Sequence, residues 1–230
     1  MRSQMSLRLR IFLAFSLGVI FFAAMLFIPA GTLKFWPGWV FMAVLFMPAI
    51  SFYLYFAKHD PQLIERRLQS KEKTSEQQRL RRFGKPVVFA ALLLPGLDYR
   101  LGWSRTYLGA VPLWLMLISQ AMVLGSILLV TWIINVNRFA SRTIQVEAGQ
   151  RVISTGPYAI VRHPMYFAFV VMGLFTPLAL GSYFALPAFG LSIPFYVYRL
   201  LHEEKVLRRE LPGYSEYCLR TRFRLVPFVW

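Results

Sequence analysis

Two short stretches of this chain carry polar side chains that its otherwise apolar sequence does not explain. The first covers residues 135–166 and ends in Arg162-His163-Pro164, directly before an apolar segment. Pro164 suits the first turn of a helix, where a missing N–H group costs nothing. We therefore expect His163 at a helix N-terminus at the membrane surface, where free backbone N–H groups favour an anion or a carbonyl oxygen.

The second stretch follows the last apolar segment and contains Arg199, Glu203 and Glu204. Arg199 and Glu203 are four residues apart, so they share one face of a helix. Two adjacent carboxylates where a helix leaves a membrane are costly unless they bind a cation or a basic partner. A plainer interpretation is an Arg–Glu pair that reaches the membrane surface. Together, the two stretches suit a zwitterionic soluble cofactor above a lipid-like substrate.

The chain that must position these residues has 230 residues, of which 57% are hydrophobic and 16% charged, and its mean hydropathy is +0.51. The apolar content excludes a disordered protein. The single cysteine, Cys218, excludes a disulfide framework, and with three scattered histidines it argues against a structural zinc site. The net charge of +16 would suit nucleic acid in a soluble protein, but here it is better explained by membrane topology. We predict a polytopic membrane protein that contacts lipids and no nucleic acid.

The fold class expected is an all-α integral membrane protein with five to six transmembrane helices. A spanning helix needs about 20 mostly apolar residues, and residues 11–30, 35–57 and 108–134 meet this length. Residues 86–97 form a marginal span. The apolar block 164–198 is too long for one helix and contains Gly181-Ser182 near its middle, so we expect the last two helices to form a short hairpin.

Basic residues are distributed unevenly between the two sides that these spans define. If six segments cross, 23 of the 26 Lys and Arg residues lie on one side, and only Lys34, Arg100 and Arg105 lie on the other. The positive-inside rule then places both termini and the long loops in the cytoplasm. We expect transmembrane helices and a cytoplasmic loop in residues 1–134, and in 135–230 a catalytic region with a cytoplasmic cofactor pocket, the hairpin and an interfacial tail.

The residues named so far resemble the isoprenylcysteine carboxyl methyltransferase family and its phospholipid methyltransferase relatives. The matching motif is Gly-Pro-Tyr-x-x-x-Arg-His-Pro-x-Tyr at residues 156–166, followed by Glu203-Glu204 and by Tyr214-x-x-Tyr217. The resemblance is strong over residues 135–227, some two fifths of the chain. The N-terminal spans agree only in hydropathy and in a Trp-Pro-x-Trp turn at residues 36–39.

The resemblance implies S-adenosylmethionine as the cofactor. The cofactor-binding residues that it implies are Gln145, Gln150, Arg151, Val152, Ile153, Tyr158, His163, Pro164, Met165, Tyr166, Glu203 and Glu204. In this scheme Glu203 holds the amino group of the cofactor, and Glu204 lies nearby. Arg199 is implied as the residue that faces the substrate and orients a carboxylate.

The implied chemistry asks little of the protein, because S-adenosylmethionine is a sulfonium with a good leaving group. Transfer is an in-line displacement, so positioning and desolvation should dominate. A carboxylate acceptor is already ionised, whereas an amine or thiol must lose a proton, for which His163 is the candidate base. No metal is required. The partner expected is a lipophilic small molecule or a lipidated substrate, and carboxylate, amine and thiol acceptors all remain open.

Two other classes of protein compete with this interpretation. Membrane reductases of the sterol or steroid type have a similar C-terminal arrangement but use NADPH. Their motif usually carries Asn before the tyrosine and an acidic residue soon after it, whereas this chain has Met165-Tyr166-Phe167-Ala168-Phe169. The other alternative is a non-catalytic lipid-binding membrane protein, against which Arg199, His163, Tyr166 and Glu203 argue because all four are present.

Overall fold

The computed structural model describes residues 6–69, 89–139, 146 and 149–230, and every regular element in those residues is a helix. Three helices are long and apolar enough to cross a membrane: α1 (Leu7–Ala30), α2 (Trp36–His59) and α6 (Leu113–Val136). These correspond to the three long spans expected from the sequence. The last one starts at Leu113, later than expected, because Pro112 caps its first turn from an extended conformation. The described residues are therefore all-helical in their regular structure, and the three long helices support a membrane protein.

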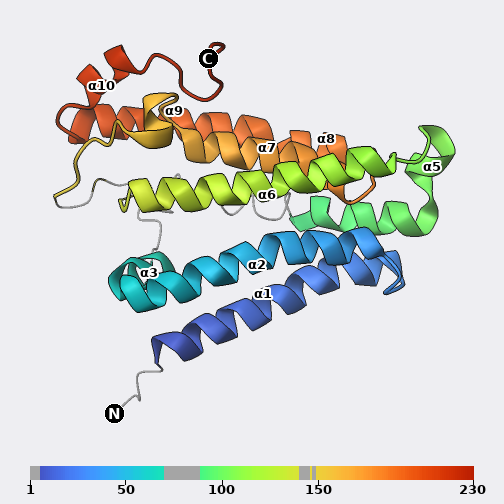
Figure 1. Cartoon of the computed structure of the whole chain (residues 1–230). Coiled ribbons are helices and arrows are strands. Elements are labelled where there is room, and N and C mark those ends of the chain that lie inside the picture. Colours follow the sequence, from blue (N-terminus) through green and yellow to red (C-terminus); the bar gives the residue numbers. More distant parts are fainter. Residues whose placement is uncertain (1–5, 70–88, 140–145, 147–148) are drawn as a thin grey trace.

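The expected hairpin is present at the C-terminal end of the apolar sequence. Helix α7 (Pro164–Ala179) ends before Gly181, whose positive φ of 76° turns the chain. The chain returns through α8 (Leu186–Gly190) and α9 (Ser192–Glu210), which lie along α7 in Figure 1. Since α9 continues to Glu210, the three charged residues of the second polar stretch lie on the returning helix itself.

A buried carboxylate fastens the turn of this hairpin to the helical residues 89–101. Asp98 is 3% exposed and accepts a hydrogen bond of 2.7 Å from the backbone of Ser104 at α5 (Trp103–Tyr107). It also accepts hydrogen bonds from the hydroxyls of Ser104 and Ser182. Ser104 in turn accepts a bond of 2.9 Å from the backbone of Tyr183. These hydrogen bonds thus hold the turn that follows α7 against residues 98–104.

The short helix α3 (Pro61–Gln69) covers the other end of the bundle, near the start of α7. Asp60 accepts a hydrogen bond from the backbone of Leu63 and pairs with Arg138, which follows α6. Leu63 and Ile64 are buried in a cluster that also contacts Met165. In Figure 1 this helix lies beside the end of α2. The cluster therefore links the N-terminal helices to the first turn of α7.

Gly96 is expected to tolerate no larger residue, because residues 89–101 approach α1 closely there. A Cβ atom at Gly96 would overlap the backbone carbonyl of Leu26, and it would lie 3.1 Å from the backbone nitrogen of Ala30. Gly96→Ala must push the two helices apart, which costs about 1–3 kcal/mol of unfolding free energy. Gly125→Ala on α6 is the matched control, since nothing lies within 4 Å of its Cβ position. Thermal unfolding in detergent checks both, and equal stability of the two variants would contradict this packing.

Candidate functional site

Residues 149–163, which we call the strip, lead into α7 and are joined to the C-terminal tail by backbone hydrogen bonds. The strip passes through the 3₁₀ turn η1 (Gly156–Ala159) and reaches His163, the N-cap of α7. The N–H of Arg162 donates to the carbonyl of Phe223, and the N–H of His163 donates to that of Arg224, both at 2.9 Å. The N–H group of the N-cap His163 and that of the preceding Arg162 therefore meet carbonyl oxygens of the tail.

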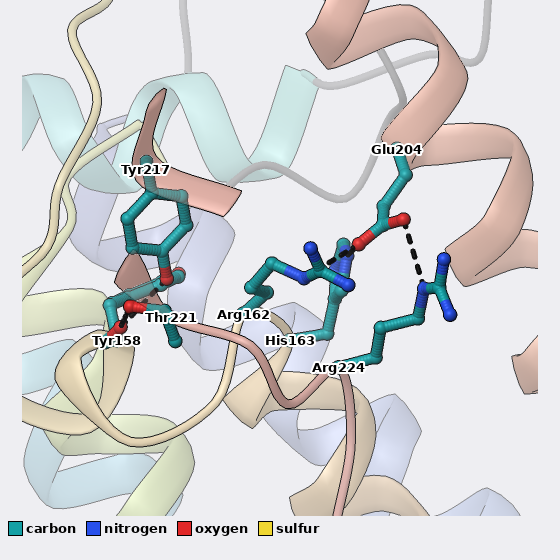
Figure 2. Close-up of polar contacts among 7 residues, drawn as sticks. All are labelled: Tyr158, Arg162, His163, Glu204, Tyr217, Thr221 and Arg224. Carbon is teal, nitrogen blue, oxygen red and sulfur yellow. Dashed lines mark hydrogen bonds and ion pairs between the residues drawn. The ribbon is translucent and has the colours of Figure 1, made fainter. Parts of the chain in front are cut away.

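The carboxylate of Glu204 is surrounded by cationic and imidazole side chains (Figure 2). Its Oε1 lies 2.9 Å from Nε of Arg162 and 3.5 Å from Nε2 of His163. Its Oε2 accepts a hydrogen bond of 3.1 Å from Nε of Arg224. The side chains of Glu204, Arg162 and His163 are 5%, 6% and 4% exposed. We call these four residues the Glu204 cluster; they bring together the strip, α9 and the tail.

Electrostatics keep Glu204 ionised inside this cluster. Burial alone would raise the pKa of Glu204, but His163, Arg224 and Arg162 stabilise its charged form and together lower its pKa to about 2. The pKa of Glu204 in the folded protein is therefore well below the usual value for glutamate.

Because the folded-state pKa of Glu204 is depressed, its contribution to stability is complete above the unfolded pKa, near 4.5. That contribution is lost as the pH falls from about 5 towards 2. We expect the free energy of unfolding to decrease over this range, and to decrease less in Glu204→Gln. Denaturation of the detergent-purified protein at stepped pH checks this; parallel pH profiles for wild type and variant would contradict it.

The neighbouring residue, Glu203, points to a different set of partners. The hydroxyl of Tyr166 donates to Oε2 of Glu203 at 2.7 Å, and Arg199 interacts with the same hydroxyl. Glu203 and Arg199 are half-buried. Tyr166 is buried among residues that include Leu200 and Leu225. The expected face of α9 is thus formed, with Arg199 and Glu203 on either side of one tyrosine from α7.

Residues of the expected cofactor strip pack on α10 (Tyr214–Arg220). Val152 and Tyr158 contact the buried Tyr214 and Tyr217, and the hydroxyl of Tyr217 donates to the carbonyl of Tyr158 at 2.7 Å. The hydroxyl of Tyr158 accepts from Nδ2 of Asn137 at 3.1 Å. Burial raises the pKa of Tyr158, the hydrogen bond from Asn137 lowers it, and the negative charge of Glu203 raises it further. Together these effects bring the pKa of Tyr158 to about 12. Tyr158 is therefore a neutral phenol at physiological pH, and it lies within electrostatic reach of Glu203.

Seven of the predicted site residues fall into three groups, and the others lie apart from these. Glu203 and Arg199 both interact with Tyr166, His163 joins Glu204, and Val152 and Tyr158 join the two tyrosines of α10. Pro164 is fully buried, Met165 packs towards α3, and Arg151 is exposed. Gln150 and Ile153 are half-buried on the strip. Gln145 lies outside the described residues.

Sequence reasoning missed the partners of Glu204. Arg162 was seen only as part of a motif and Arg224 only as a basic residue of an interfacial tail, yet both bind this carboxylate. Asn137, which bonds Tyr158, was also missed. One signal was available: neighbouring residues on a helix point about 100° apart, so Glu203 and Glu204 are expected to have different surroundings.

Comparison with known proteins agrees with the resemblance read from the motif. Residues 115–209 match the model of the isoprenylcysteine carboxyl methyltransferase (ICMT) family, which confirms a relationship to that family for this part of the chain. The matched segment contains most of α6, all of α7 and most of α9, and hence every member of the Tyr166–Glu203–Arg199 group. The match and the helices together support a membrane protein whose residues 115–209 are related to this family.

A curated relative points in part to a second class. The Delta(14)-sterol reductase TM7SF2 of Mus musculus is 29% identical over 93 residues, which are 38% of this chain and 22% of the relative. The chain therefore spans about a fifth of the length of that relative. The chain is thus similar to proteins of two chemistries, and the choice between them depends on the side chains of the site.

Proposed function

We propose that this protein is an S-adenosylmethionine-dependent membrane methyltransferase that acts on a lipophilic acceptor, with the carboxylate of a prenylated cysteine as the leading candidate. The observation that carries the proposal is the arrangement of Arg199 and Glu203 around the Tyr166 hydroxyl, inside the segment that matches the family. One carboxylate and one guanidinium on the same helix face suit a cofactor with a cationic amino group beside an anionic acceptor.

In this proposal each residue of the group has one task. Glu203 accepts the amino group of the cofactor and is held in place by the hydroxyl of Tyr166. Arg199 orients the acceptor carboxylate. Gln150, Arg151, Val152, Ile153 and Tyr158 line the cofactor from the strip, and the site faces the cytoplasm. The bound cofactor supplies an activated methyl group, so the chain needs to align acceptor and cofactor and to exclude water.

A second candidate function is an NADPH-dependent reductase, which the similarity to the mouse sterol reductase favours. NADPH carries several phosphate charges and requires basic side chains that are available to bind them. Two arginines near the strip, Arg162 and Arg224, are instead paired with Glu204. The absence of Asn before Tyr166 in the motif argues in the same direction. We therefore place the reductase second.

The experiment that tests the proposed reaction measures transfer of a radioactive methyl group. Purified protein in lipid vesicles is incubated with methyl-labelled S-adenosylmethionine and an S-prenylated cysteine that has a free carboxylate. A carboxyl methyl ester releases labelled methanol in mild alkali, whereas a methylated amine or thioether keeps its label. Alkali-labile label is the expected result. Parallel incubations contain a phospholipid amine or a lipophilic thiol, and stable label on either would transfer the activity to that class of acceptor. No incorporation with any of the three acceptors would contradict the proposal.

A further inference from the structure

The two adjacent carboxylates of α9 are held in unlike surroundings. Glu203 is half-buried and bonded to a neutral hydroxyl, whereas Glu204 is buried and has a basic or imidazole partner at each oxygen. A cofactor amino group could reach Glu204 only by displacing an arginine from it. Removing one partner of a buried ion pair leaves an uncompensated charge, which is strongly unfavourable. Glu204 is thus poorly suited to be a direct ligand, although the resemblance implied that role.

The Glu204 cluster fastens a segment of the tail that we call the strap, residues 221–230. The strap is joined to the strip by the two backbone bonds from Arg162 and His163, and to α9 by the bond from Arg224 to Glu204. Arg224 also lies over the ring of Trp230, 5.5 Å from its centroid. Figure 2 shows Arg162, His163 and Arg224 converging on Glu204 from two different segments of the chain. A single carboxylate therefore joins three segments that are far apart in sequence.

The strap in turn packs on the tyrosine that holds Glu203. Leu225 is 5% exposed and lies in one cluster with Tyr166 and Leu200, against which Val226 and Trp230 also pack. The amides of Leu225 and Val226 donate to the carbonyl of Trp230 at 2.8 and 3.0 Å, which closes the strap on itself. A shift of the strap would therefore loosen Tyr166, whose hydroxyl orients Glu203.

We infer that Glu204 is a positioning residue that fastens the strap over Tyr166, and that the strap is a wall of the cofactor site. This inference rests on the proposed function, since it assigns Glu203 alone to the cofactor. His163 belongs to the same fastening: its ring is buried against Glu204 and is not presented to an acceptor. The sequence predicted only an interfacial, lipid-facing tail here. In this inference the strap also lines the cofactor site with its inner face.

The test is a double-mutant cycle read by affinity for S-adenosylhomocysteine and by amide hydrogen exchange in the full-length protein. Glu204→Gln and Arg224→Gln are each expected to weaken the affinity about tenfold by misplacing Glu203. The double variant should lose no more than either single variant, because both changes release the same strap. Exchange at Arg162 and His163 should accelerate in each variant, while exchange in α6 stays unchanged. Arg208→Gln, a change of the same kind at an exposed residue of α9 outside the strap, should alter neither readout.

Two results would overturn the inference. One is a loss of affinity in the double variant equal to the product of the two single losses, and the other is amide exchange at Arg162 and His163 that stays at the wild-type rate. Arg224 has a side chain that is 33% exposed, so Arg224→Gln keeps the test available if Glu204→Gln fails to fold. Wild-type protein that binds no S-adenosylhomocysteine would contradict the proposed function and the assignment of the strap to a cofactor site. Hydrogen exchange would still decide separately whether Glu204 fastens the strap.

Discussion

Glu203→Gln is expected to weaken binding of S-adenosylhomocysteine about a hundredfold, because a half-buried carboxylate that accepts a cationic amino group loses its charge. The amide can still accept the hydrogen bond of 2.7 Å from Tyr166, so the fold should be preserved. Isothermal titration with detergent-purified protein measures the affinity, and a thermal scan measures the stability. The expected signature is a large loss of affinity with little change in melting temperature.

A matched control for Glu203→Gln is available on the same helix. Glu210 lies at the end of α9 and pairs with its exposed neighbour Arg209, so Glu210→Gln removes the same charge away from the site. Its affinity for S-adenosylhomocysteine should equal that of the wild type. If the two variants lose affinity equally, general electrostatics explains the effect. If Glu203→Gln binds normally, its assignment to the amino group is wrong.

Arg162→Met is expected to have the largest effect on stability, about 3 kcal/mol of unfolding free energy. The side chain of Arg162 is 6% exposed, and its loss leaves Glu204 buried with one fewer cation. Combining Arg162→Met with Glu204→Gln should recover part of the loss, because the buried negative charge is then also removed. Unfolding in denaturing detergent mixtures measures the free energy of unfolding of the wild type, of Arg162→Met and of the double variant.

The control for Arg162→Met is Arg208→Met, which removes an exposed charge from α9 and should change stability by less than about 0.5 kcal/mol. Equal destabilisation by both substitutions would mean that the ion pair at 2.9 Å contributes nothing specific. Further destabilisation on adding Glu204→Gln, in place of recovery, would contradict the view that an unpaired Glu204 charge causes the loss.

The helices were predictable because their signals are local. The long apolar stretches without charge identified α1, α2 and α6, and Gly181-Ser182 identified the turn of the hairpin. Pro164 correctly predicted the first turn of α7, with His163 as its N-cap. The short helix α3 lies in a segment that was expected to be a loop. Its residues Leu63 and Ile64 are buried by contacts with Ile134 and Met165, which are far away in the sequence.

The sequence predicted which residues belong to the candidate site, but it predicted less well which partners each of them has. Spacing correctly placed Arg199 and Glu203 on one face, and their contact with Tyr166 follows from the hairpin. Glu203 and Glu204 have different partners partly because Arg224 pairs with Glu204 alone. Arg224 lies in the C-terminal tail, and no local sequence pattern predicts that this tail packs on α7 and α9. The same holds for Asn137, which reaches Tyr158 only once α6 and the strip are packed. The assignment of site residues to the cofactor stays a prediction.

The most direct test of the central claim is calorimetric binding of S-adenosylhomocysteine and, separately, of NADPH to the full-length protein in detergent and in lipid nanodiscs. Our account predicts saturable binding of S-adenosylhomocysteine, a much weaker interaction in Glu203→Gln, and no binding of NADPH. Binding of NADPH alone would contradict the account and identify the site as that of a reductase. Binding of neither ligand in lipid would contradict the assignment of a cofactor site to Tyr166, Glu203 and Arg199.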